Sequence, residues 1–121
     1  MSILVTGATG FIGGATAQAL LEAGESVHLL LRPETDPAYW RDLGAQVFVG
    51  SIADPTEVHS AALGCECVIH CAGLASHRSS MKALGWVNVA GTENVLNAAS
   101  HAECGRLIHL SCANVTLYNG D

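Results

Sequence analysis

Four glycines fall within eight positions near the start of the chain: Gly7, Gly10, Gly13 and Gly14. The first three are spaced G-x-x-G-x-x-G, between a short apolar run at 3–6 and a segment with helical periodicity. Gly7 permits a tight turn, Gly10 lets a pyrophosphate approach the backbone, and Gly13 lets the helix pack close to the sheet. The free amides and the dipole of the helix start attract an anion. The pattern predicts nucleotide binding; the alternative is a glycine-rich structural turn.

A second candidate binding residue is Arg32, which lies nineteen positions after Gly13. An acidic residue about 20 positions past the loop would bind the ribose 2′-hydroxyl of NAD, whereas arginine accommodates a 2′-phosphate. A guanidinium offers a bidentate fork to phosphate. We therefore predict NADP as the cofactor, with NAD as the alternative. Arg32 could instead be a solvated loop residue, and Glu34 or Asp36 could pair with it or bind the ribose themselves.

These residues must be positioned by alternating strands and helices. Asp54-Pro55-Thr56-Glu57 is a strong helix start, in which Asp54 accepts from exposed amides and Glu57 can reach back. Residues 32–42 read as a loop with at most one turn of helix. The predicted strands are 3–6, 27–31, 46–49, 67–71 and 106–110, and the predicted helices run from Phe11 to Gly24, from Pro55 to Gly64 and from Leu84 to about His101. Continuously apolar strands indicate a parallel sheet covered on both faces, so we expect an α/β fold of the Rossmann type, a doubly wound parallel sheet.

The motifs together resemble one family. TGATGFIGG at 6–14 is similar to the amino-terminal fingerprint of the extended short-chain dehydrogenase/reductase superfamily. That superfamily includes sugar-nucleotide epimerases and dehydratases, the 3β-hydroxysteroid dehydrogenase type and dihydroflavonol-reductase-like enzymes. Residues 68–73 resemble the family's fourth strand and turn, 88–92 its Asn-Val-x-Gly-Thr helix signature, and 108–112 its fifth strand. The resemblance runs from residue 3 to about residue 118. It implies cofactor contacts from Gly7, Thr9, Gly10, Phe11, Ile12, Gly13, Arg32, Ser51, Ile52, Ala72, Gly73 and Asn88.

One of these positions departs from the family pattern, and the others have expected roles. Ser51 stands where an aspartate usually faces the adenine, and Ile52 is expected to flank the adenine ring. Ala72 and Gly73 are expected near the nicotinamide ribose, or else form a simple tight turn. Asn88 would shape the active-site backbone, or else bond locally.

The resemblance implies hydride transfer assisted by a Tyr-x-x-x-Lys pair and a serine or threonine after the fifth strand. Cys112 stands at that hydroxyl position and Ser111 beside it, so these two are the candidate catalytic residues. Tyr39 and Tyr118 have no lysine four residues later.

We expect residues 1–121 to be the amino-terminal part of an NAD(P)-binding Rossmann domain, truncated after the fifth strand, with the Tyr/Lys helix and the substrate region absent. The full-length protein is then expected to bind a small-molecule substrate and to form a homodimer. The alternative function is a non-catalytic dinucleotide-binding or redox-sensing module.

Composition excludes several other classes. Five Lys and Arg against eleven Asp and Glu give a net charge of −6, which argues against a nucleic-acid partner. We expect no membrane span, because no apolar run approaches about 18 residues. Five cysteines without a repeated spacing, and a start without a basic segment, favour the cytoplasm. The six histidines are scattered, with no pair three or four residues apart, so no metal site is expected.

Overall fold

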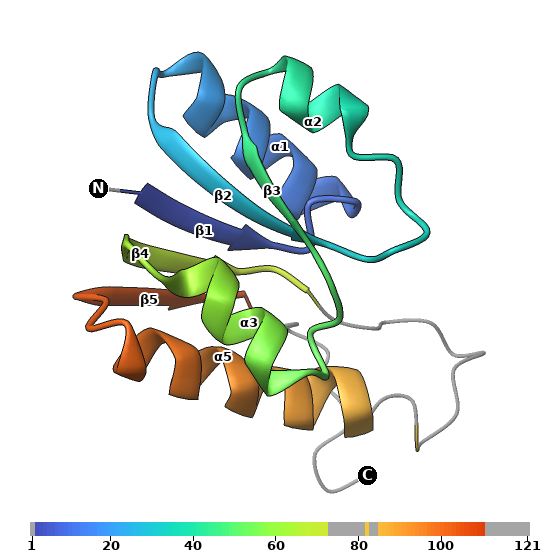
Figure 1. The fold of residues 1–121 in the computed structure, drawn as a ribbon, viewed down its shortest axis with the longest axis vertical. Coiled ribbons are helices and arrows are strands. Elements are labelled where there is room, and N and C mark those ends of the chain that lie inside the picture. The colour runs from blue at the N-terminus through green and yellow to red at the C-terminus, as the bar shows by residue number, and fades with distance from the viewer. Residues whose placement is uncertain (1, 73–81, 83–84, 111–121) are drawn as a thin grey trace, which may run out of the picture.

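The computed structural model describes residues 2–72, 82 and 85–110. Within them the chain alternates between strands and helices, as the sequence predicts (Figure 1). The elements are β1 Ser2–Thr6, α1 Phe11–Glu22, β2 Ser26–Leu31, α2 Ala38–Asp42, β3 Gln46–Val49, α3 Pro55–Ala62, β4 Cys65–His70, the π-helix η1 Gly85–Ala90, α5 Gly91–His101 and β5 Arg106–His109.

The strands form one parallel sheet in the order β3-β2-β1-β4-β5. The chain therefore moves outward from β1 to β3, returns past β1, and continues through β4 to β5 on the other side. In Figure 1, α1 and α2 lie on one side of the sheet and α3 and α5 on the other. This is the doubly wound α/β arrangement that the sequence predicts.

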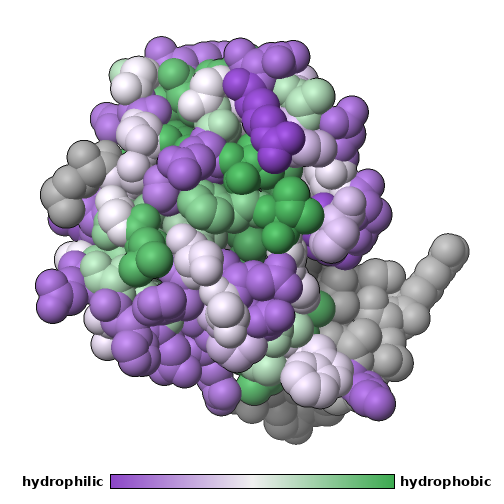
Figure 2. Space-filling model, in the orientation of Figure 1, coloured by the Kyte–Doolittle hydropathy of each residue, from purple (hydrophilic) through white to green (hydrophobic). Residues whose placement is uncertain are grey.

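Neighbouring residues of the central strand face opposite layers. Leu4 packs with Val58 of α3 and Val95 of α5, whereas Val5 packs with Ala17 of α1 and Trp40 of α2. Both faces of the strand are buried, which explains why its sequence is continuously apolar rather than alternating. At the β3 edge Val49 stays 48% exposed, and apolar surface gathers near the middle of the face shown in Figure 2.

Two boundaries differ from the sequence prediction. β4 begins at Cys65, two residues earlier than expected, because Cys65 pairs with Ser2 across a register irregularity and its side chain is buried. The expected single long helix is instead a π-helix over Gly85–Ala90 that continues as α5. Gly91 stands at the junction, where a Cβ would lie 3.1 Å from the Ile52 side chain, so glycine permits this close approach.

The start of α3 differs from the expectation in one bond. Asp54 Oδ1 accepts from the N–H groups of Thr56 at 2.9 Å and Glu57 at 3.4 Å, as a helix cap should. The Glu57 carboxylate, however, accepts from the N–H of Ser51 at 3.1 Å rather than from that of Asp54. The Asp54 N–H donates to the Ser51 carbonyl at 3.0 Å, so it does not need the glutamate.

No helix among the described residues is both long and apolar enough to cross a bilayer.

Candidate cofactor site at the carboxyl edge of the sheet

A cavity of about 330 Å³ opens at the carboxyl ends of the central strands. It lies where β1 separates β2 from β4, the point at which the strand order reverses and at which open α/β sheets bind ligands. Its lining comes from five segments: the end of β1 with the loop after it, the end of β2, the loop after β3, the turn after β4 and the helix η1. The lining residues are Thr6, Gly7, Ala8, Thr9, Gly10, Leu30, Leu31, Arg32, Ser51, Ile52, Cys71, Ala72 and Val87.

At two positions of the glycine loop, Gly7 and Gly13, backbone atoms occupy the space that a side chain would need. Gly7 has a φ of +78°, and a Cβ there would lie 2.6 Å from the Ala72 nitrogen. A Cβ on Gly13 would overlap the carbonyl group of Gly7. Gly10 precedes α1, and among the described residues no side chain caps this helix. The N–H groups of its first turn therefore remain available to an anion beside a tightly packed loop.

The six predicted loop residues divide into two groups. Gly7, Thr9 and Gly10 line the cavity. Gly13 is buried beneath the loop, where it lets α1 approach, while Phe11 is 92% and Ile12 49% exposed. In this structure Phe11 and Ile12 lie on the surface of α1 rather than in the cavity lining.

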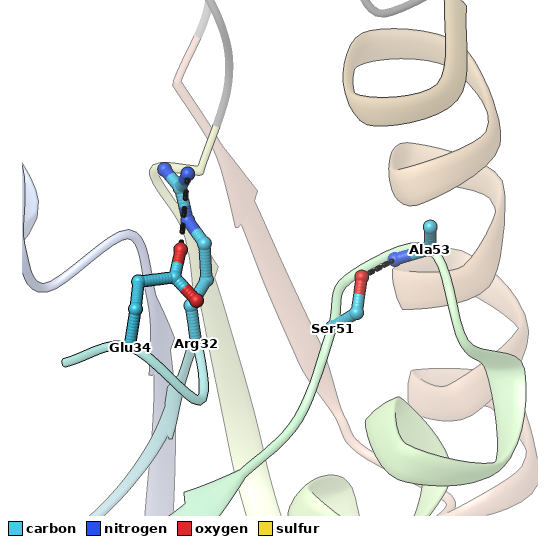
Figure 3. A network of polar contacts seen from close by, with 4 residues as sticks. All are labelled: Arg32, Glu34, Ser51 and Ala53. Atoms are coloured by element: carbon cyan, nitrogen blue, oxygen red, sulfur yellow. Dashed lines mark hydrogen bonds and ion pairs between the residues drawn. The ribbon is translucent and has the colours of Figure 1, made fainter.

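Arg32 lines the cavity at the end of β2 and is paired with Glu34 (Figure 3). Arg32 Nη1 lies 3.9 Å from Glu34 Oε1, and the two side chains are 63% and 69% exposed. The other nearby acid, Asp36, instead accepts from the N–H of Ala38 at 2.9 Å at the start of α2. Of the two acids, then, Glu34 pairs with Arg32. An exposed pair of this kind contributes less than about 1 kcal/mol, so it can open easily for a ligand.

The loop after β3 brings Ser51 and Ile52 to the cavity and is held from both sides. Ser51 Oγ accepts from the N–H of Ala53 at 3.1 Å (Figure 3). Asn94 Nδ2 of α5 donates to the Ile52 carbonyl at 2.9 Å. The Glu57 carboxylate lies behind the loop, in the space that a Cβ on Gly50 would fill. Glu57 was not among the predicted site residues, although its place three residues after a helix cap predicts a bond that reaches backward.

His70, at the end of β4, occupies the centre of a polar cluster and was not among the predicted site residues. Thr6 Oγ1 accepts from the N–H groups of Cys71 at 3.1 Å and Ala72 at 3.2 Å, and it lies 2.7 Å from His70 Nδ1. His70 Nε2 lies 3.2 Å from Thr92 Oγ1. Burial, with a smaller contribution from neighbouring His109, lowers the pKa of His70 to about 4. His70 is therefore neutral near pH 7.

The remaining predicted residues have different positions. Ala72 lines the cavity. Asn88 lies in η1 beside the cavity-lining Val87, and its carbonyl accepts from Thr92 Oγ1 at 2.7 Å. Gly73, Ser111 and Cys112 lie outside the described residues. Within the described residues, no group of three or more His, Cys, Asp or Glu side chains could hold a metal ion.

The glycine loop, the cavity and the strand order are those of a nucleotide-binding sheet, and the chain matches a known family over the same region. Residues 3–118 match the model of the NAD dependent epimerase/dehydratase family. The chain belongs to this family. This match confirms the family resemblance that the motifs predict. The members of the family are dinucleotide-dependent dehydrogenases and epimerases of the extended short-chain type.

Several known proteins are similar to this chain. A 4-hydroxy-2-methyl-3-oxo-4-farnesyl-3,4-dihydroquinoline-1-oxide ketoreductase from Stigmatella aurantiaca is 35% identical over 92% of this chain and 33% of its own length. A 2-alkyl-3-oxoalkanoate reductase from Stenotrophomonas maltophilia is 35% identical over 96% of this chain and 34% of its own. A short-chain dehydrogenase/reductase superfamily protein from Agrobacterium tumefaciens, solved with bound NAD, superposes with a TM-score of 0.81 at 32% identity, over 95% of this chain and 34% of that one. The chain thus spans about a third of the length of these relatives.

Proposed function

We propose that the chain binds a dinucleotide in the cavity and forms the cofactor-binding part of an oxidoreductase or epimerase that acts by hydride transfer at a substrate hydroxyl or carbonyl. The observation that carries the proposal is the cradle beside the cavity, where a Cβ on Gly7 or Gly13 would meet backbone atoms. Such a surface admits the pyrophosphate close to main-chain amides. The relatives named as reductases and the relative solved with NAD support the same function.

In this proposal each segment of the cavity has a separate role. A bound nicotinamide supplies or accepts the hydride, and the residues of this chain orient it and exclude water. The glycine loop holds the pyrophosphate, Ser51 and Ile52 contact the adenine, and Ala72 leaves room for the nicotinamide ribose. The further proposed contacts are Thr9, Phe11, Ile12, Gly73 and Asn88.

The reacting end of the site extends beyond the described residues. We propose that Ser111 or Cys112 borders the substrate, and that residues 1–121 form the amino-terminal part of a Rossmann domain whose Tyr/Lys helix and substrate region lie outside them. A hydroxyl donates a stronger hydrogen bond than a thiol, so Ser111 is the better of the two candidates. The second candidate function is a non-catalytic dinucleotide-binding or redox-sensing module. It is favoured by the thiol at position 112 and by the uncharged Ser51, whose hydroxyl bonds Ala53.

The first test is a titration of the purified 121-residue chain with NADPH and NADH. We expect saturable binding that is weaker than micromolar and no hydride transfer to carbonyl substrates, because the chain supplies only one side of the site. The dissociation constants are measured by chemical-shift titration of the amide signals. Submicromolar affinity or measurable turnover would contradict the proposal that residues 1–121 form only part of the site. Chemical-shift changes confined to residues away from the glycine loop would contradict the proposed site.

We also propose that Arg32 binds the ribose 2′-phosphate and makes NADP the preferred cofactor. R32Q is expected to weaken NADPH binding about tenfold, the effect of losing a charge-assisted hydrogen bond, and to leave NADH binding nearly unchanged. E34Q removes the competing partner of Arg32 and is expected to strengthen NADPH binding about threefold, since an exposed pair of this kind contributes up to about 1 kcal/mol.

The matched control is Arg41→Gln, which removes an arginine of α2 that is also exposed and does not line the cavity. Both dissociation constants are measured for all four proteins at one ionic strength, because salt screens such effects. Equal loss of NADPH affinity in R32Q and R41Q would show only a net-charge effect. A stronger effect of R32Q on NADH than on NADPH would favour NAD instead.

We further propose a cytoplasmic location and, for the full-length protein, a homodimer. The outer surface of η1 and α5 exposes Trp86, Val89 and Leu96 at 54%, 60% and 49%, which supports a protein contact there.

A further inference from the structure

The hydrogen bonds around His70 run in one direction, and this direction determines its tautomer. A hydroxyl has two acceptor positions and one proton. Thr6 Oγ1 accepts from the N–H of Ala72, and it shares the N–H of Cys71, at 3.1 Å, with the Thr6 carbonyl at 3.2 Å. The Thr6 hydroxyl proton therefore points to His70 Nδ1, 2.7 Å away. His70 Nδ1 is then an acceptor, and the ring proton is on Nε2, which donates to Thr92 Oγ1 at 3.2 Å.

The far end of the chain of bonds agrees with this assignment. Thr92 Oγ1 donates its own proton to the Asn88 carbonyl at 2.7 Å, which leaves its lone pairs free to accept from His70. We refer to Thr6, His70 and Thr92, with their bonds to residues 71, 72 and 88, as the hydrogen-bond chain. It joins the strand before the glycine loop to the turn after β4 and to η1.

The surroundings of His70 favour a neutral ring. The side chain is 1% exposed, and the polar partners from β1 and α5 are threonine hydroxyls without charge. His109 of β5 stacks on the His70 ring, with the two ring centroids 5.3 Å apart. The next residue in the sequence after His70 is the uncharged Cys71. Among the described residues, no carboxylate lies within ion-pair distance of His70. A second proton on the ring would have no acceptor on Nδ1 except the hydroxyl that now donates to it.

The segments that the hydrogen-bond chain joins are also those that line the cavity. Cys71 and Ala72 form one wall and Val87 of η1 another. The Ala72 nitrogen lies within 2.6 Å of the place where a Gly7 Cβ would be, so the turn packs directly against the glycine loop. A shift of this turn would change the space left for a dinucleotide.

We infer that His70 is a positioning residue for the dinucleotide site, a neutral imidazole with its proton on Nε2 that holds the turn at 71–72 and the η1 helix in place against the glycine loop. The inference rests on the proposed function for its effect on affinity. The tautomer and the position of the turn are properties of the chain without ligand. These two parts can be measured separately.

The tautomer is measured by long-range proton–nitrogen correlation spectra of the ¹⁵N-labelled chain between pH 5.5 and 7.5. We expect one His70 signal set with a protonated Nε2 and an unprotonated Nδ1, unchanged over this range. A proton on Nδ1, or titration near pH 6.5, would overturn the inference whether or not the chain binds a dinucleotide.

The positioning role is tested by a matched pair of variants at the far end of the hydrogen-bond chain. Thr92→Val keeps the shape of threonine and removes the hydroxyl, whereas Thr92→Ser keeps the hydroxyl and removes a methyl group. T92V is expected to weaken NADPH binding about fivefold, the effect of one hydrogen bond, and T92S is expected to stay within about twofold of the wild type. Amide spectra confirm that both variants are folded.

Hydrogen exchange separates failure of the inference from failure of the proposed function. T92V is expected to accelerate exchange of the Cys71 and Ala72 amides, and T92S is not. If the wild-type chain binds neither NADPH nor NADH, the proposed function is wrong, and the exchange result alone decides whether the hydrogen-bond chain holds the turn. Equal affinity and equal exchange in T92V and T92S would overturn the positioning role.

Discussion

Replacing Gly13 by alanine is expected to abolish dinucleotide binding and to lower the free energy of unfolding by about 3 kcal/mol. The new Cβ would overlap the carbonyl group of Gly7 and lie 3.2 Å from the Ala8 nitrogen. Both neighbours belong to the backbone and cannot rotate away, so the loop or α1 has to move. Because the same loop lines the cavity, stability and binding are lost together.

The control for this prediction is Gly10→Ala in the same loop. Gly10 has a φ of −86° and a ψ of 170°, which alanine adopts readily, and its Cβ would lie 3.4 Å from the Gly7 oxygen. G10A is expected to cost less than about 1 kcal/mol of stability while still weakening dinucleotide binding, because its methyl group would stand where we propose that the pyrophosphate approaches. Urea unfolding and chemical-shift titration measure the two quantities. A G13A protein with wild-type stability would contradict the packing argument, and wild-type affinity in G10A would contradict the place of the pyrophosphate.

Replacing His70 by asparagine is expected to flatten the dependence of stability on pH between about 4 and 6.5. In the unfolded chain a histidine binds its proton near pH 6.5, whereas the pKa of folded His70 is lowered to about 4 by burial and by His109. Between these values the unfolded state binds more protons, so stability rises with pH and is lost as the pH falls. For a side chain that is 1% exposed, the loss from pH 7 to pH 4 amounts to at most about 3 kcal/mol.

Asparagine does not titrate, and its side-chain amide can still accept from Thr6 at about the position of Nδ1. Urea unfolding at half-unit intervals from pH 4.0 to 7.5 gives the two stability curves. Carboxylates and the other five histidines contribute to both proteins, so the difference between the curves reports His70. H70N is expected to be less stable at pH 7 and to approach the wild type as the pH falls. Parallel curves would show that the pKa of folded His70 is not lowered.

The sequence predicts most of the fold because the relevant signals are local. The apolar runs, the glycines Gly24 and Gly64 and the Asp54-Pro55 cap identify five strands and their connecting helices, and the described structure confirms their order. The errors occur where a distant contact overrides the local pattern. The π-helix before Gly91 interrupts a regular helical spacing at the point where α5 packs against Ile52, and β4 starts early because Cys65 finds a partner in Ser2.

The site divides in the same way. Seven of the predicted residues line one cavity: Gly7, Thr9, Gly10, Arg32, Ser51, Ile52 and Ala72. Glu57 and His70 were not predicted as site residues: the spacing of Glu57 from the helix cap predicts only a backward bond, and no spacing marks His70. The Glu57 carboxylate occupies the space that the missing side chain of Gly50 leaves free. His70 contacts the hydroxyls of Thr6 and Thr92, which lie 64 residues before it and 22 residues after it in the sequence.

By itself, the sequence determined the alternation of strands and helices, the glycine loop and the family, because periodicity, caps and a contiguous motif are properties of neighbouring residues. Only the tertiary structure decided that Glu34 rather than Asp36 pairs with Arg32, that Glu57 supports Ser51, and that His70 is neutral. Those outcomes depend on distances and burial, and a parallel sheet creates both by bringing the carboxyl ends of separate strands to one edge.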